Sequence, residues 1–152
     1  METCPVTPKP FILATLLYSA VTMIHGFTWH FTFFSDTYHQ LGIYNREPPI
    51  IPLGFTSMIL QGLILAFLYP RYFRGGRPLV EGVKFGLLMG TFLFSVSTLA
   101  NAAKIHVSSM STWLTIQTAF HLIQFIIVGA GIGLIYGSNR KAADGRSTLK
   151  GQ

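Results

Sequence analysis

The sequence predicts an all-α, polytopic membrane protein in which four transmembrane helices form an antiparallel bundle. Three observations indicate this fold class: half of the 152 residues are hydrophobic, only 11% are charged, and the apolar residues gather in four long stretches. A soluble domain usually carries about 25% charged residues. The low charge therefore excludes a soluble enzyme, a disordered chain and a conventional nucleic-acid-binding domain.

Each apolar stretch is long enough to cross a bilayer, which takes roughly 20 apolar residues in a helix. Proline and glycine residues lie between the stretches, where they interrupt helices. The connections are too short to hold another domain, so we expect residues 1–152 to form a single membrane domain. The four expected spans are residues 11–34, 50–69, 80–103 and 112–136.

The basic residues are distributed unequally, and their distribution predicts the orientation of the chain. With four spans, both termini and the middle loop share one face, and nine of the 11 basic residues lie on or near it. Only Arg46 and Lys104 lie on the other face. Because Lys and Arg accumulate on the cytoplasmic side, we expect both termini in the cytoplasm and a location in the bacterial inner (cell) membrane.

The distribution of charge also predicts the behaviour of the C-terminal tail and the kind of partner that the protein binds. Residues 138–152 are polar and basic, and we expect them to form a mobile tail. The net charge of +6 follows from topology and attracts anionic lipid headgroups. We therefore expect no nucleic-acid partner.

Glycines recur at every fourth residue in the third and fourth expected spans. At this spacing each set forms one stripe, where missing side chains let helix backbones approach closely, as in GxxxG packing. Both stripes fall in the cytoplasmic half, so we expect them to pack against each other; the alternative is that one stripe is a self-association seam. The glycines are Gly82, Gly86 and Gly90 in the third span and Gly129, Gly133 and Gly137 in the fourth.

Polar side chains gather in the opposite, outer half of the spans. His25 in the first span and His121 in the fourth each lie nine residues from the outer boundary. At 1.5 Å per residue this is roughly 13 Å deep, and the two helices are neighbours in the predicted bundle, so the histidines could meet. The other members of this candidate polar pocket are Gln61, Asn101, Gln117 and Gln124.

Two interpretations of these buried polar residues stay open. In the first, imidazole and amide groups hydrogen-bond each other between helices, at about 0.6 kcal/mol per contact. In the second, they line a pocket for a haem, a metal or a quinone-like headgroup, and two histidines at equal depth suit bis-imidazole ligation of haem b. Because buried polar groups usually pair with one another, the first interpretation is the default expectation.

A second group of histidines lies near the outer surface. Imidazole and carboxylate groups are ligands that suit copper or zinc. These residues come from separate segments without a recognised metal-binding spacing, so we expect no metal site there. The group comprises His30, His39 and His106, with Asp36 nearby.

The spans lack the residues that many membrane enzymes use for chemistry. Glu81 is the only carboxylate within them, and Cys4 is the only cysteine, which excludes a disulfide framework and a CxxC pair. No phosphate-binding loop, HExxH helix or serine elbow occurs. These absences favour a protein that is not an enzyme.

By elimination, we expect a non-catalytic integral membrane protein: an accessory or assembly subunit of a larger membrane complex, or a binder of lipid or another hydrophobic ligand. Its partners would be the lipid bilayer and other membrane subunits or further copies of itself. Two alternatives remain. One is an electron carrier that binds haem b or a quinone through His25 and His121; the other is an oligomeric channel or carrier whose vestibule is the outer polar half.

Overall fold

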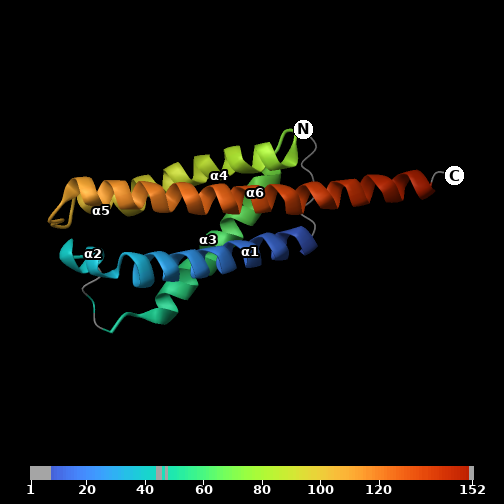
Figure 1. Cartoon of the computed structure of the whole chain (residues 1–152). Helices are drawn as coiled ribbons and strands as arrows, with labels where there is room; N and C mark the ends of the chain where they lie inside the picture. Colours follow the sequence, from blue (N-terminus) through green and yellow to red (C-terminus); the bar gives the residue numbers. More distant parts are fainter. Residues whose placement is uncertain (1–7, 44–45, 47, 151–152) are drawn as a thin grey trace.

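The computed structural model describes residues 8–43, 46 and 48–150, with the backbone alone for residues 140–150. Every regular element in these residues is helical, which confirms the predicted all-α class (Figure 1). Two of the elements, η1 and η2, are π-helical turns. In chain order the elements are α1 (Pro8–Phe27), η1 (Thr28–Phe33), α2 (Ser35–Gln40), α3 (Ile51–Tyr72), α4 (Pro78–Phe94), η2 (Ser95–Leu99), α5 (Ala100–Ala102) and α6 (Met110–Lys150).

Four helical stretches are long and apolar enough to cross a membrane, as the sequence predicts. Each overlaps one expected span and differs from it by a few residues at its ends. The early starts follow from proline, which is tolerated in the first turn of a helix because its missing N–H has no partner there. The stretches are Pro8–Phe33, Ile51–Tyr72, Pro78–Ala102 and Met110–Asn139.

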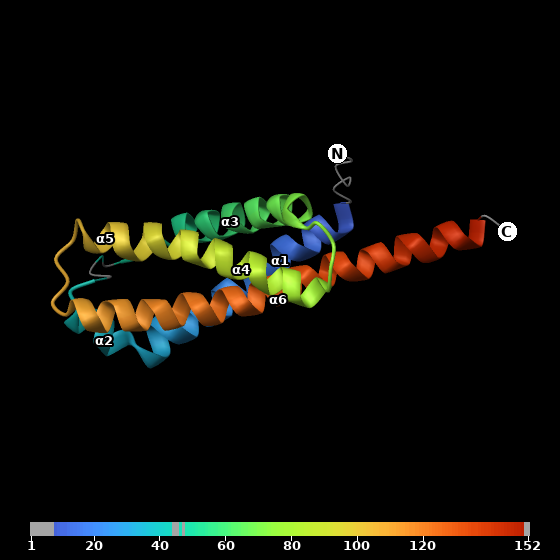
Figure 2. The same ribbon diagram turned by 90° about the horizontal axis from the view of Figure 1, so that it is seen from above.

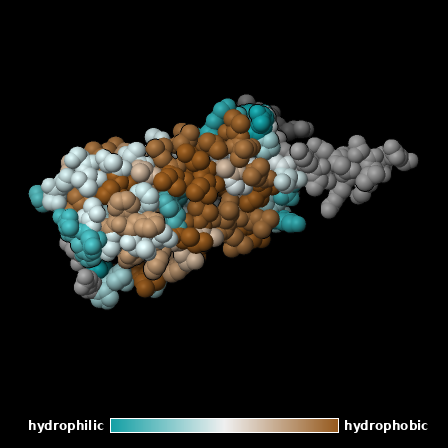
Figure 3. Space-filling view, in the orientation of Figure 1, coloured by the Kyte–Doolittle hydropathy of each residue, from teal (hydrophilic) through white to brown (hydrophobic). Residues whose placement is uncertain are grey.

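The surface of the molecule supports a membrane location. Figure 3 shows hydrophobic side chains gathered over the middle of one face, with hydrophilic residues toward both ends. Large apolar side chains point outward, among them Ile24 and Phe92, which are 64% and 59% exposed. Soluble proteins rarely expose apolar surface this extensively, whereas the hydrocarbon core of a bilayer accommodates it.

The long helices associate in two pairs. α1 packs on α3, and α4 packs on α6. Figure 1 shows α4 and α6 running side by side and α3 crossing α1, and Figure 2 shows α4 and α6 closest near the turn from α3 to α4. α1 also packs on α6 and so joins the two pairs, whereas α3 has few contacts with α4 or α6. The connections that contain α2 and that precede α6 lie at one end of the molecule, here called the α2 end; the turn from α3 to α4 lies at the other, the α3–α4 end (Figure 1).

The backbones of α4 and α6 touch along their glycine stripes. A Cβ atom built on Gly82 would lie 2.8 Å from the Cα of Gly133, and one on Gly86 would lie 3.0 Å from the Cα of Gly129. Real Cβ atoms essentially never approach other atoms within 3.0 Å. A side chain at either position would meet the backbone of the facing helix, and we call this line of close approach the glycine seam.

The remaining glycines of the two stripes face side chains of the partner helix. A Cβ atom on Gly90 would lie 2.8 Å from the Cβ of Phe125, and one on Gly137 would lie 2.5 Å from Pro78. All six glycines therefore face α4 or α6 of the same chain.

Helix α6 continues well beyond the expected end of the fourth span at residue 136. It stays helical to Lys150, so residues 138–150, where the sequence predicts a mobile tail, have regular structure, and residues 151–152 lie outside the described residues. The tail contains Ala, Lys and Arg, which are strong helix formers. Once α6 has started, each added residue gains a helical hydrogen bond, so composition alone does not stop the helix.

Candidate functional site

Four ring side chains gather around Phe120 toward the α2 end, and we call these five residues the aromatic–histidine cluster. Phe120 stacks on His25, with ring centroids 4.7 Å apart and planes at 12°. The rings of His30 and His121 lie 4.7 Å and 5.3 Å from the Phe120 ring. Trp29 completes the cluster at 5.9 Å. Phe120 is only 9% exposed, and three imidazole rings surround it.

The first span contributes three of these rings because its helix changes form near its end. His25 and Trp29 are four residues apart, so they share one face of a regular α-helix. In such a helix His30, five residues after His25, would point elsewhere. The π-helical turn η1 has a wider i→i+5 repeat, and it brings His30 to the side that packs on Phe120.

His121 on α6 uses both of its ring nitrogens in hydrogen bonds. Nδ1 donates to the main-chain carbonyl of Gln117 at 2.8 Å, because a carbonyl oxygen can only accept. In the neutral ring Nε2 is then an acceptor, 3.0 Å from the Ser97 hydroxyl. That hydroxyl also lies 2.7 Å from the main-chain carbonyl oxygen of Leu93, so its one proton serves only one of the two acceptors at a time. Ser97 belongs to η2, so this bond ties the second π-helical turn to α6.

His25 and Trp29, by contrast, bury nitrogen atoms without using them. Within the part of the chain that the structure describes, neither ring nitrogen of His25 makes a well-formed hydrogen bond, and the indole Nε1 of Trp29 makes none either. The side chain of Gln124 is the hydrogen-bonding neighbour of the His25 imidazole, although the contact falls short of a well-formed bond. Its Nε2 donates to the Thr22 hydroxyl at 3.0 Å. Its Oε1 is also buried and unpartnered. Unmade bonds therefore concentrate on the α1 side of the cluster.

The two histidines of the predicted pocket do not bond each other. His25 lies against one face of Phe120, with nearly parallel rings, and His121 meets the same ring edge-on, at 87°. Both histidines thus pack on the Phe120 ring, in different orientations, rather than on each other. The sequence places them at equal depth, and only the structure shows that they share a phenyl ring as their neighbour.

Two further residues of the predicted pocket lie away from the cluster. Gln61 on α3 accepts a hydrogen bond from the Tyr18 hydroxyl and donates to the Ser57 hydroxyl at 2.9 Å. Asn101 is exposed and donates to the main-chain carbonyl of Ser97 at 2.8 Å. The Tyr18–Gln61 bond links α1 to α3. The Asn101–Ser97 bond is local and lies at the end of the third span.

The outer histidine group does not form one site. His30 lies in the cluster, while His39, His106 and Asp36 are exposed. Among the described residues, no three His, Cys, Asp or Glu side chains are placed to hold a metal ion. Cys4 lies outside the described residues.

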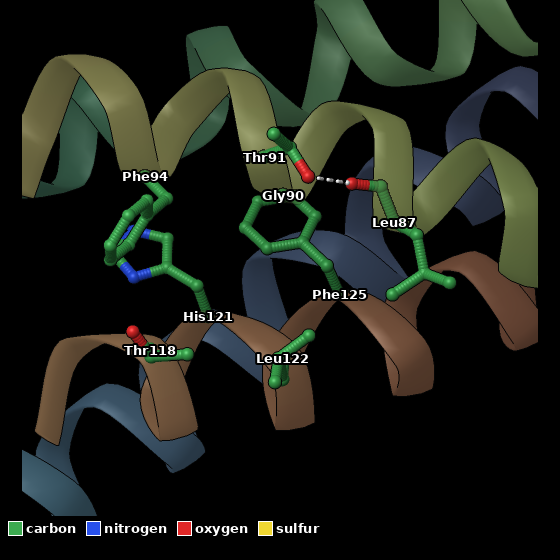
Figure 4. A pocket seen from close by; sticks show the side chains of 8 residues that line it. All are labelled: Leu87, Gly90, Thr91, Phe94, Thr118, His121, Leu122 and Phe125. Atoms are coloured by element: carbon green, nitrogen blue, oxygen red, sulfur yellow. Dashed lines mark hydrogen bonds between the residues drawn. The ribbon is translucent and has the colours of Figure 1, made fainter. Parts of the chain in front are cut away.

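Two cavities adjoin the cluster. One, of about 110 Å³, lies between α4 and α6, where the ring of His121 rises beside Phe94 and Phe125 (Figure 4). The other, of about 390 Å³, lies at the α2 end, and His30 forms part of its wall. Ligand sites commonly measure about 300–1,000 Å³, so only the second cavity reaches that range.

Comparisons of the chain with protein-family models, with curated proteins and with solved structures find no match. Function therefore has to follow from the residues and geometry of this chain.

Proposed function

We propose that the chain is an integral membrane protein that binds a hydrophobic ligand at the aromatic–histidine cluster. The observation that carries this proposal is the set of buried, unpartnered nitrogen atoms of His25 and Trp29. A buried polar group without a hydrogen bond costs about 1–3 kcal/mol. Native proteins rarely leave such groups unpaired, so a bound molecule that accepts hydrogen bonds is the natural complement.

The proposal includes the orientation of the chain. The chain crosses the bacterial inner membrane as an antiparallel four-helix bundle with both termini in the cytoplasm. Arg71, Arg74 and Arg77 lie at the α3–α4 end, which is then the cytoplasmic end by the positive-inside rule. The cluster, toward the α2 end, occupies the outer half of the membrane.

The chemistry of the cluster fits a flat ring that carries a carbonyl oxygen, as a quinone does. The rings of His25 and Trp29 are in edge contact, with centroids 5.4 Å apart, so their N–H groups belong to one small region of the cluster and are the donors that a carbonyl oxygen would use. Phe34, 4.7 Å from Trp29, and Phe120 supply aromatic faces against which a flat ring packs. The side chains of both residues are partly exposed although their nitrogen atoms are buried, so a ligand would reach these donors only after a local movement of the rings.

Tryptophan fluorescence tests this proposal, because the chain has only two tryptophans. In a Trp113→Phe background, Trp29 is the sole reporter, and a short-chain quinone should quench it saturably. We expect His25→Phe to weaken binding about tenfold, the loss of one hydrogen bond from a buried donor. His106→Phe, at an exposed histidine, is the control. Equal binding of an alkylbenzene without carbonyl groups would contradict the proposal.

The geometry disfavours haem b as the ligand. Axial ligation by His25 and His121 needs a free nitrogen on each ring, with both facing one iron atom. His121 has both nitrogens in hydrogen bonds, and the two rings pack on Phe120 rather than on each other. An oxidised-then-reduced absorption spectrum decides the matter: a Soret band that His121→Ala abolishes would replace the quinone with haem.

A second candidate function, an accessory subunit of a larger membrane complex, is favoured by the packing of α3. This helix contacts mainly α1 and leaves large side chains such as Leu53 and Phe67 exposed, at 64% and 47%. A partner helix could cover this face. Purification in mild detergent separates the candidates, because a subunit should bring a membrane protein with it in fixed stoichiometry, whereas a ligand binder should not. A channel is disfavoured, because the glycine seam leaves no polar path between α4 and α6.

A further inference from the structure

The 390 Å³ cavity at the α2 end has two kinds of wall. η1, α2 and the residues just before α3 enclose it. Its polar wall carries Ser35, His39 and Arg46, and its apolar wall includes Phe31 and Ile50. A cavity with charge on one side and hydrocarbon on the other is suited to an amphiphile rather than to a wholly apolar or wholly polar molecule.

The charge of Arg46 is not neutralised by any carboxylate that the structure describes. The one ion pair among the described residues joins Lys84 to Glu81 at 2.8 Å, and these residues belong to α4, which begins at the opposite end. A guanidinium group stays protonated in proteins and presents several donors in a planar fork. That fork matches the two oxygens of a carboxylate or the oxygens of a phosphate.

The apolar wall leads from the cavity to the membrane surface. Phe31 is 63% exposed and Ile50 is 49% exposed, so both side chains line the cavity and also reach the outside of the bundle. Phe31 lies near the end of the first apolar span, and Ile50 immediately precedes the second. The cavity therefore lies at the depth where lipid headgroups join their acyl chains.

We propose that the α2-end cavity binds an acyl-chain amphiphile whose oxyanion headgroup, a carboxylate or a phosphate, pairs with Arg46 while its chain passes Phe31 and Ile50 into the membrane. This site differs from the ligand site of the proposed function and shares only the wall residue His30 with it. A fatty acid and an anionic phospholipid both carry this chemistry, and they are separated by the test.

Calorimetric titration of the full-length protein in a neutral maltoside detergent tests the proposal. Dodecanoate is compared with its methyl ester, and dihexanoyl phosphatidic acid with dihexanoylglycerol, so each pair differs in its anionic group. We expect at least one anionic member to bind at least tenfold more tightly than its neutral partner. Preference for dodecanoate identifies the fatty acid, and preference for the phosphatidic acid identifies the phospholipid; equal binding within both pairs would overturn the proposal.

Variants of single basic residues test whether Arg46 supplies the positive charge that binds the anionic headgroup. Arg46→Gln should weaken binding of the anionic ligand about tenfold, and Arg46→Lys should retain it within about threefold, because the charge remains while the fork is lost. Lys104→Gln is the matched control: it removes the other basic residue expected on this side, which does not line the cavity. Equal losses in Arg46→Gln and Lys104→Gln would show only general attraction and would overturn the proposal.

The two ligand sites can fail independently. His25→Phe should leave dodecanoate binding unchanged, and Arg46→Gln should leave quinone quenching of Trp29 unchanged. Loss of anion binding in His25→Phe would show that one site serves both ligands, which contradicts a separate cavity site. Absence of quinone binding together with intact, Arg46-dependent anion binding would overturn the proposed function alone.

Discussion

The glycine seam and the aromatic–histidine cluster lie on the same helix, α6, and bury its surface in opposite ways. In the seam the buried surface is backbone, and a Cβ atom at Gly86 or Gly129 would clash with the facing helix. In the cluster it is large rings, three of them imidazoles around Phe120. The seam is complete within the chain, whereas the cluster leaves hydrogen-bonding atoms unused. This difference separates a region whose contacts all lie within the chain from the region where we propose that a ligand binds.

The two sides of the aromatic–histidine cluster differ in the same way, in how far their polar atoms are hydrogen-bonded within the chain. His121 has a hydrogen-bonding neighbour at each ring nitrogen, Ser97 and the Gln117 carbonyl, while neither nitrogen of His25 makes a well-formed bond. The α6 side of the cluster thus resembles the seam in being self-sufficient. The α1 side is where a ligand is expected.

The largest effect should come from adding a methyl group to the seam. In Gly86→Ala the new Cβ would lie 3.0 Å from the Cα of Gly129 and closer still to the carbonyl oxygen of Phe125. Backbone cannot move aside as a side chain can, so we expect the free energy of unfolding to fall by about 3 kcal/mol. This loss of unfolding free energy is measured by unfolding the protein in mixtures of maltoside and dodecyl sulfate.

The control for the seam is Gly54→Ala in α3. A Cβ atom there would meet nothing within 4 Å, and alanine is a better helix former than glycine. Its unfolding free energy should be unchanged or higher. A similar loss in both variants would show that glycine matters through helix flexibility rather than through backbone contact.

A middle-sized effect is expected at His121. His121→Phe keeps the ring contacts with Phe94 and Phe120 but removes the bonds to Ser97 and to the Gln117 carbonyl. At about 1 kcal/mol for each hydrogen bond, the unfolding free energy should fall by about 2 kcal/mol in the same assay. An unchanged value would mean that His121 is no more tied into the fold than His25.

The smallest effect tests how α3 is held. The Tyr136 hydroxyl donates to the main-chain carbonyl of Ala66 at 2.7 Å and so links α6 to α3. Tyr136→Phe should lower the unfolding free energy by about 0.6 kcal/mol, the average for hydrogen bonds between membrane helices. Tyr72→Phe is the control, because its hydroxyl makes no hydrogen bond to the described residues. Equal changes in unfolding free energy for Tyr136→Phe and Tyr72→Phe would show that the Tyr136–Ala66 hydrogen bond does not stabilise the packing of α3 on α6.

Much of the fold follows from the sequence because it depends on composition and period. Four apolar stretches of sufficient length become four apolar helices, and prolines such as Pro52 and Pro78 fall in first turns. The fourfold repeat of glycine in two spans marks the two stripes that lie against each other. These signals are local, so each span reveals them without its neighbours.

The site was less predictable because it depends on tertiary detail. The sequence places His25 and His121 at one depth, but the phenyl ring on which both pack depends on the rotation of α6 about its axis. His30 reaches the cluster through a π-helical turn, for which we found no sequence signal. Gln61 bonds Tyr18 instead of the cluster because α3 packs mainly on α1. Rotation, turn type and helix pairing are decided by contacts between segments far apart in the sequence.

The central claim is that the buried nitrogens of His25 await a ligand, and the stability of His25→Phe tests it most directly. Without ligand, the variant should be as stable as the wild type or more stable by about 1 kcal/mol, because it removes polar atoms that have no partner. A short-chain quinone should then stabilise the wild type and not the variant. A loss of 1 kcal/mol or more in the ligand-free variant, with equal quinone effects on both proteins, would contradict the account.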